Sequence, residues 1–230
     1  MKNILPQTSV DFYLSGENAA VLYSRSPVDL DCQRRIWAIA QVITSEAVCI
    51  DVVPGMNNLT LIFDPELQQG ETLLARLKTL WELVEIEQFT PREVQIPVHY
   101  GGACGPDLAD VAAHTGMTEQ AVIAAHSQAE YQVYFLGFQP GFAYLGGLPA
   151  TLATPRRAEP RLEVAAGSVG IGGQQTGIYP AISPGGWQII GRTDVRLFDL
   201  HRRVPSLLQS GDIVRFVPVD ASEQMGAKHA

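Results

Sequence analysis

The first part of the chain alternates between short apolar segments and longer segments with helical spacing. Apolar residues recur every three to four positions from Asp29 to Thr44 and again from Glu71 to Val84, which predicts two helices. Asp29 has the short polar side chain that caps helix N-termini. The predicted strands are Val10–Leu14, Ala19–Tyr23, Val48–Val53 and Leu59–Phe63, the last two joined by a turn at Pro54–Asn58. The sequence therefore predicts a small α+β domain over residues 1–89.

The pattern changes after Phe89-Thr90-Pro91, which we interpret as a domain boundary. Two helices are predicted at Asp107–His114 and Glu119–His126, because Gly116 suits a helix C-terminus and Thr118 suits the next N-cap. The predicted strands here are Val94–His99, Tyr131–Phe138, Val169–Ile171, Trp187–Ile190, Val195–Asp199, Leu207–Leu208 and Ile213–Val217, with a turn-rich stretch at Gly141–Gly147. The sequence predicts a mainly-β domain over residues 90–220 and a flexible polar tail over residues 221–230.

Composition narrows the class of protein. Hydrophobic residues make up 46% and charged residues 17% of the chain, which favours a sizeable folded core. A net charge of -8 argues against a nucleic-acid surface. No apolar run approaches the ~18 residues of a membrane helix, and the N-terminus has no apolar signal-peptide region, so we expect a cytoplasmic protein. The three cysteines and five histidines show no metal-ligand spacing, which predicts reduced thiols and no metal site.

Glycines and polar side chains are concentrated between Pro155 and Thr193. Glycine lets another backbone or a ligand approach closely, so this segment is a candidate binding site on a β scaffold. A glycine-rich set of strands without a ligand is the alternative interpretation, because isolated strand glycines often mark only bulges. A phosphate-binding role would depend on four arginines: Arg156, Arg157, Arg161 and Arg192.

Two motifs match functional motifs only in part. The two helices before Ser127 have the spacing of a helix-turn-helix, but the stretch Thr118–Ser127 contains no lysine or arginine, which favours a packing helical hairpin. Ala166–Gly170 resembles a nucleophile elbow, followed later by Asp199 and His201. The glycines after it disfavour the helix that such an elbow requires. The catalytic residues therefore stay unidentified.

Several longer motifs resemble one protein family. They are Val53-Pro54-Gly55, Val133–Leu145, Ala166–Val169, Gln175–Pro180, Ser183–Trp187, Ile190–Thr193 and Gly211-Asp212. Together they are similar to the KipI family, also called allophanate hydrolase subunit 1, and the resemblance covers nearly the whole chain. Ala165 stands where the family favours proline, and Gly173 where it favours alanine.

The resemblance implies a fold, an activity and partners. The expected fold is an N-terminal α+β domain followed by a cyclophilin-like β-barrel. The expected activity is that of one component of an ATP-dependent 5-oxoprolinase, which cleaves 5-oxo-L-proline to L-glutamate. The implied partners are a KipA-like subunit and a LamB/YcsF-like subunit, with ATP and Mg²⁺ bound at the interface with a partner. Two alternatives are a regulator that inhibits a histidine kinase, and a carboxyltransferase-type subunit of a urea carboxylase or allophanate hydrolase system.

The expected chemistry selects candidate site residues from the glycine-rich segment. A lactam has one N–H donor and one C=O acceptor, which a carboxamide such as Gln175 matches. Carboxylate or phosphate groups favour arginine. The candidates for binding substrate or ATP are Arg156, Ser168, Gln174, Gln175, Thr176, Tyr179 and Arg192. Tyr144 and Trp187 are candidates for the partner interface, since aromatic residues dominate interface energetics, with a place in the core as the alternative for Trp187.

Overall fold

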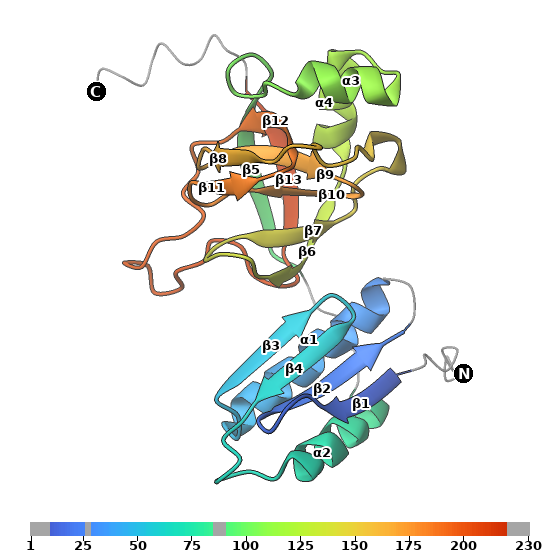
Figure 1. Cartoon of the computed structure of the whole chain (residues 1–230), viewed down its shortest axis with the longest axis vertical. Helices are drawn as coiled ribbons and strands as arrows, with labels where there is room; N and C mark the ends of the chain where they lie inside the picture. The colour runs from blue at the N-terminus through green and yellow to red at the C-terminus, as the bar shows by residue number, and fades with distance from the viewer. Residues whose placement is uncertain (1–9, 26–28, 85–90, 220–230) are drawn as a thin grey trace. The chain divides into compact units, whose positions relative to one another are not determined.

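The computed structural model describes residues 10–25, 29–84 and 91–219 (Figure 1). The chain divides into two compact units, Met1–Thr90 and Pro91–Ala230. The predicted boundary at Phe89-Thr90 lies outside the described residues, and so does the predicted tail, 221–230. Each unit is described by itself below.

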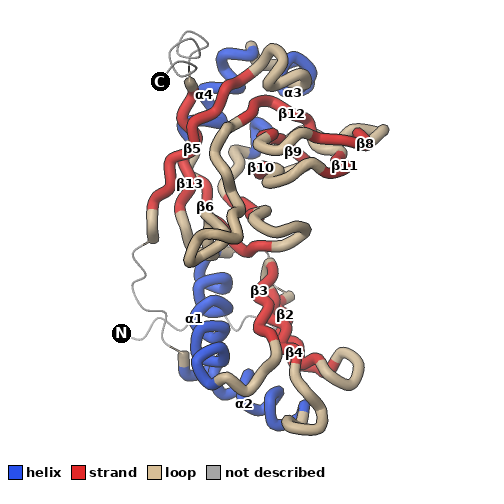
Figure 2. The backbone as a smooth tube through the Cα atoms, turned by 90° about the vertical axis from the view of Figure 1, so that its left-hand side faces the viewer, coloured by secondary structure: helices blue, strands red, loops and turns tan. Residues whose placement is uncertain are grey.

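The first unit is a four-stranded antiparallel sheet with two helices. The strand order is β1-β2-β4-β3. The strands are β1 (Val10–Leu14), β2 (Ala19–Ser24), β3 (Asp51–Gly55) and β4 (Asn58–Ile62), and the helices are α1 (Leu30–Glu46) and α2 (Gly70–Leu83). Ile36 and Ile43 of α1, Leu77 of α2, and Leu59 and Leu61 of β4 are fully buried in one core. Both helices therefore cover the same face of the sheet, and Figure 2 shows α1 running along it.

Local capping explains where α1 begins and how the following strand is placed. The Asp29 side chain accepts hydrogen bonds from the backbone N–H groups of Asp31 and Cys32, as predicted for an N-cap. The helix ends at Ala47, which has a left-handed conformation with φ 53°. The prediction of a strand over Val48–Val53 is wrong in its bounds, because the helix continues to Glu46 and β3 starts only at Asp51.

The second unit is a closed seven-stranded barrel in the order β10-β7-β6-β13-β5-β12-β9. The barrel strands are β5 (Glu93–Tyr100), β6 (Tyr131–Leu136), β7 (Ala143–Gly146), β9 (Ser168–Gly172), β10 (Gln175–Ile178), β12 (Gln188–Arg192) and β13 (Ile213–Pro218). A separate pair is formed by β8 (Arg161–Val164) and β11 (Ser183–Gly185), after a short 3-10 helix, η1 (Ala150–Leu152). The structure thus confirms a mixed α+β fold that contains a barrel.

Two helices, α3 (Leu108–Thr115) and α4 (Glu119–Gln128), pack against the barrel and bury Leu108, Val111 and Val122 in its core (Figure 1). Gly116 has φ 69° and ends α3, and the Thr118 hydroxyl caps α4 by accepting from the Ala121 N–H. The predicted pair of helices is therefore confirmed, and so are the predicted roles of Gly116 and Thr118 at their ends.

Four predictions in this unit are wrong. The stretch Gly141–Gly147 contains β7, and β6 ends at Leu136 because Phe138 has φ 66°, which extended backbone does not allow. Val195–Asp199 and Leu207–Leu208 do not form strands. Only a single bridge, between Phe198 and Ser206, links them, because the chain turns back at Asp199, whose carboxylate accepts from the His201 N–H.

Candidate functional site

Glycines on β9 and β10 make room for one large ring. Val169 and Ile171 of β9 point into the barrel core, so Gly170 and Gly172 face the opposite side of the strand. A Cβ atom added to Gly172 would overlap Cδ1 and Nε1 of Trp187. The space beside Gly172, which the sequence suggested for a ligand, is therefore filled by Trp187 of the same chain.

Trp187 belongs to a second, smaller core outside the barrel, which we call the outer cluster. Its members are Phe142, Val164, Tyr179, Trp187 and Ile189, with Tyr144 packed against them. The ring centroids of Phe142 and Trp187 are 5.8 Å apart. Trp187 is 6% exposed and Tyr144 is half-buried. The structure places Trp187 inside its own chain, in accordance with the core alternative, and leaves part of Tyr144 at the surface.

The close packing at Gly172 leads to a prediction. Gly172→Ala should lower the free energy of unfolding by about 1–3 kcal/mol, because the new methyl group overlaps the indole ring of Trp187. The melting temperature should fall accordingly. Gly186→Ala is the matched control, since a Cβ there meets its nearest atom, Cγ of Pro160, at 3.6 Å. Thermal unfolding of the two variants checks this, and equal melting temperatures would contradict it.

Next to the outer cluster, two arginines share one buried carboxylate; we call Asp107, Arg157 and Arg161 the arginine–aspartate cluster. Arg157 Nη1 and Arg161 Nη2 both donate to Oδ1 of Asp107, at 3.1 and 2.6 Å. The other oxygen, Oδ2, accepts the Ile189 N–H at 2.6 Å. Asp107, 2% exposed, thus connects the start of α3 to β12 and to the segment that enters β8.

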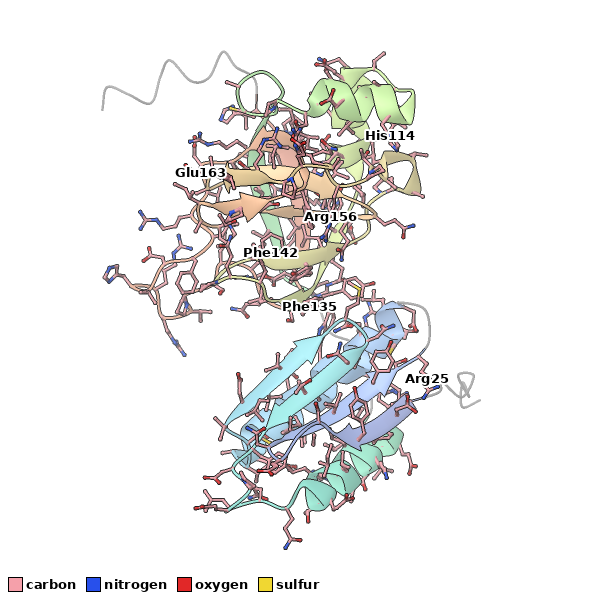
Figure 3. The ribbon with its side chains drawn as sticks, viewed as in Figure 1. Arg25, His114, Phe135, Phe142, Arg156 and Glu163 are labelled. Carbon is pink, nitrogen blue, oxygen red and sulfur yellow. The ribbon has the colours of Figure 1, made fainter. Side chains whose placement is uncertain are left out.

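Tyr179, a member of the outer cluster, lies close enough to Arg156 and Arg161 to interact with their charges. Burial raises the pKa of its phenol, while the Trp187 N–H and the positive charges of Arg156 and Arg161 act in the opposite direction. The structure therefore brings together two predicted site residues, Arg156 and Tyr179. Arg156 is exposed, and Figure 3 labels it in the same unit as the buried Phe142.

Two other candidates, Gln174 and Gln175, lie near the same segment. Gln174 is exposed in the turn between β9 and β10, and Gln175 is half-buried at the start of β10. A pair of backbone hydrogen bonds between Thr154 and Gly173 holds this turn against the chain that leads to Arg156. The glutamines and Arg156 therefore lie on adjoining segments, which we call the rim of the candidate site.

The remaining candidates lie elsewhere. Ser168 and Arg192 face each other across β9 and β12, at the end of β9 opposite to Gly172 and hence about 13 Å from it. Arg192 is exposed, whereas Ser168 is buried. The structure does not bring these two residues to the rim formed by Arg156 and the glutamines.

Thr176 lies inside the barrel, in a polar network with His126. The Thr176 hydroxyl donates to the Gly170 carbonyl at 3.0 Å and lies 2.9 Å from His126 Nε2, so Nε2 carries the proton and donates to it. His126 Nδ1 then accepts from the Tyr100 hydroxyl at 2.8 Å. Burial lowers the pKa of His126 to about 3. Both side chains are 0% exposed, so Thr176 does not face a surface site.

Sequence reasoning missed Asp107, which it treated only as the start of a helix. No local sequence signal marks its role, because an aspartate before a helix is typical of an N-cap. In the structure its side chain makes no capping hydrogen bond and binds Arg157, Arg161 and the Ile189 N–H instead. Among the described residues, no group of three histidine, cysteine or acidic side chains could hold a metal ion. Within the same residues, no helix is long and apolar enough to cross a membrane.

Comparison with known proteins identifies the family. A family model described as carboxyltransferase domain, subdomain C and D, matches residues 10–208. The chain belongs to this carboxyltransferase subunit family. A relative from Escherichia coli O157:H7, named as the B subunit of 5-oxoprolinase, is 54% identical over 206 residues, which cover 90% of this chain and 94% of the relative. A protein of the same name from Haemophilus influenzae is 50% identical over 201 residues, covering 87% of this chain and 94% of the relative.

A solved structure shares the fold. The crystal structure of TTHA0988 superimposes with a TM-score of 0.77 and 38% identity over 88% of this chain. The match covers 39% of that protein, so the present chain spans about two fifths of its length. The family predicted from the sequence motifs is confirmed.

Proposed function

We propose that this chain is the B subunit of an ATP-dependent 5-oxoprolinase, which cleaves 5-oxo-L-proline to L-glutamate. The observation that carries the proposal is the identity of 54% and 50% to two proteins named as the B subunit of 5-oxoprolinase, each matched over 94% of its length. The implied partners are a KipA-like subunit and a LamB/YcsF-like subunit. The proposed location is the cytoplasm, because the reaction consumes ATP.

The chemistry of the reaction fits the side chains that the chain offers. A lactam is a poor electrophile with a poor leaving group, and ATP with Mg²⁺ supplies phosphoryl transfer that activates it. Catalysis of phosphoryl transfer depends mainly on positioning and on stabilising charge. Arg156 and Arg161, the arginines near Tyr179, are suited to that task, because guanidinium groups donate strong hydrogen bonds to phosphate and carboxylate oxygens. We assign the magnesium ligands to ATP, water or a partner, because Mg²⁺ in such reactions keeps several waters and binds the phosphates of the nucleotide.

The isolated chain should be inactive, because the relatives on which the proposal depends are named as one subunit of 5-oxoprolinase. ADP formation dependent on 5-oxoproline should rise at least about 100-fold, or roughly 2.7 kcal/mol in the barrier, when both partner subunits are added. A coupled ADP assay on the chain alone, on each pair of subunits and on all three subunits tests this. Full turnover by the chain alone would contradict the prediction.

The same preparations separate the two alternatives. A complete assembly without turnover, together with inhibition of a histidine kinase by the chain, would favour the regulator. Carboxyl transfer to urea by the assembly would favour the carboxyltransferase subunit, the activity that the description of the family model suggests.

A further inference from the structure

We propose that Arg157 and Arg161 form a binding subsite for an anionic oxygen group of a ligand, with Asp107 as the positioning residue that holds both guanidinium groups. The inference rests on the proposed function, which supplies two ligands with such groups: the carboxylate of 5-oxoproline and the phosphates of ATP. The sequence predicts Arg156 and Arg192 as the cationic groups of the site. The subsite keeps Arg156, adds Arg157 and Arg161, and leaves Arg192 out.

The first argument is the balance of charge. Two guanidinium groups meet one carboxylate, which leaves a net positive charge of one in the arginine–aspartate cluster. Both oxygens of Asp107 are already occupied, one by the two arginines and the other by the Ile189 N–H. Two nearby acidic side chains, Glu159 and Glu163, are exposed and form no ion pair with these arginines in the described part of the chain. A bound anion would neutralise the excess charge.

The second argument is the number of unused donors. Arg157 Nε and Arg161 Nη1 are buried and have no hydrogen-bond partner among the described residues. Arg92, in contrast, meets Asp212 one to one through two of its nitrogens and donates again to the Leu207 carbonyl. The ion pair of Arg92 is thus matched by its partners, whereas the arginine–aspartate cluster retains two buried donors without a partner among the described residues.

The third argument is access and surroundings. The side chains of Arg157 and Arg161 are 33% and 27% exposed, so a ligand can reach both from solvent. Arg161 acts electrostatically on the phenol of Tyr179, which brings a buried aromatic surface next to the cationic groups. The Arg157 N–H donates to the Gly186 carbonyl, which fixes the backbone of the segment between β11 and β12 beside it. A small ring with one anionic substituent matches this combination of an apolar wall and paired donors.

The test uses the complete three-subunit assembly with Arg157→Gln and Arg161→Gln, and with Arg161→Lys as a variant that keeps the charge. Arg215→Gln is the matched control, because Arg215 is also ion-paired, to Glu93 and Glu130, and is 39% exposed. Steady-state kinetics give KM and kcat for 5-oxoproline and for ATP. The lactam 2-pyrrolidinone, which lacks the carboxylate, serves as an inhibitor probe. Melting temperature and assembly are measured on every preparation.

If the subsite binds the substrate carboxylate, Arg161→Gln raises KM for 5-oxoproline at least about tenfold, or roughly 1.4 kcal/mol. In that case inhibition by 2-pyrrolidinone and KM for ATP stay unchanged, and Arg161→Lys recovers part of the loss. If the subsite binds phosphate, KM for ATP rises instead. Variants that fold and assemble normally, with both KM values within about twofold of wild type, overturn the subsite.

Calorimetric binding of 5-oxoproline and ATP to the same assemblies keeps this test separate from the proposed function. A wild-type assembly that binds a ligand without turning it over refutes the proposed function alone, and the subsite is then judged by the affinity of the arginine variants. Variants that bind both ligands as tightly as wild type overturn the subsite. A wild-type assembly that binds neither ligand also overturns it.

Discussion

Replacing Asp107 by alanine should lower the free energy of unfolding of the barrel unit by about 3 kcal/mol. The change leaves Arg157 and Arg161 without their shared carboxylate and leaves the Ile189 N–H without an acceptor. The expected value is at the lower end for a broken buried ion pair, because the two guanidinium groups are a quarter to a third exposed. Urea denaturation followed by tryptophan fluorescence measures it.

Asp110→Ala is the control for this effect, because Asp110 lies in the first turn of the same helix but is exposed. Its loss should change the unfolding free energy by at most about 0.5 kcal/mol. Loss of a helix cap does not explain the difference, since the Asp107 side chain makes no capping hydrogen bond. Equal stabilities of the two variants would show that Asp107 is not the link between α3, β12 and the segment entering β8.

Acid should destabilise the folded chain through His126. Burial lowers the pKa of His126 to about 3, below the ordinary value of about 6.5 that the residue regains on unfolding. Between these values the unfolded chain binds more protons than the folded chain. The contribution of His126 is therefore fully present above about pH 6.5 and is lost as the pH falls toward 3, by up to about 1.4 kcal/mol per pH unit.

Denaturation curves at several pH values between 4 and 7 test this prediction. We expect the unfolded chain to bind roughly one proton more than the folded chain in this range. His126→Gln should show a shallower dependence on pH, although it also loses stability at pH 7, because Tyr100 and Thr176 then lose part of their network. His114→Gln, on the exposed side of α3, should keep the wild-type slope. A wild-type slope in His126→Gln would assign the effect to other groups.

Features set by neighbouring residues could be predicted from the sequence. Asp29, Gly116 and Thr118 cap helices as expected, because a cap depends on hydrogen bonds within three residues. The strand Val10–Leu14 is also where the apolar pattern placed it. The same local reasoning failed at Val195–Asp199, where Val195 and Leu197 pack against the barrel core from a loop.

The candidate site depends on contacts between distant residues, which local patterns do not reveal. Asp107 is 50 residues from Arg157 and 54 from Arg161 in the chain, so nothing in the local sequence links them. One error was avoidable. Side chains alternate between the two faces of a strand, so Gln175 and Thr176 cannot both face the same ligand. The structure shows Thr176 on the inner face.

The position of β13 also affects when the barrel can fold during synthesis. This last strand pairs with β5 on one side and with β6 on the other, and Asp212 just before it binds Arg92, 120 residues earlier. Until β13 leaves the ribosome, β5 and β6 both carry an open edge, and the ring of strands has a gap. The first unit, whose strands are complete by Ile62, can fold while the barrel is still being translated. The barrel itself closes only near the end of synthesis, and until then its exposed edges are surfaces that chaperones can protect.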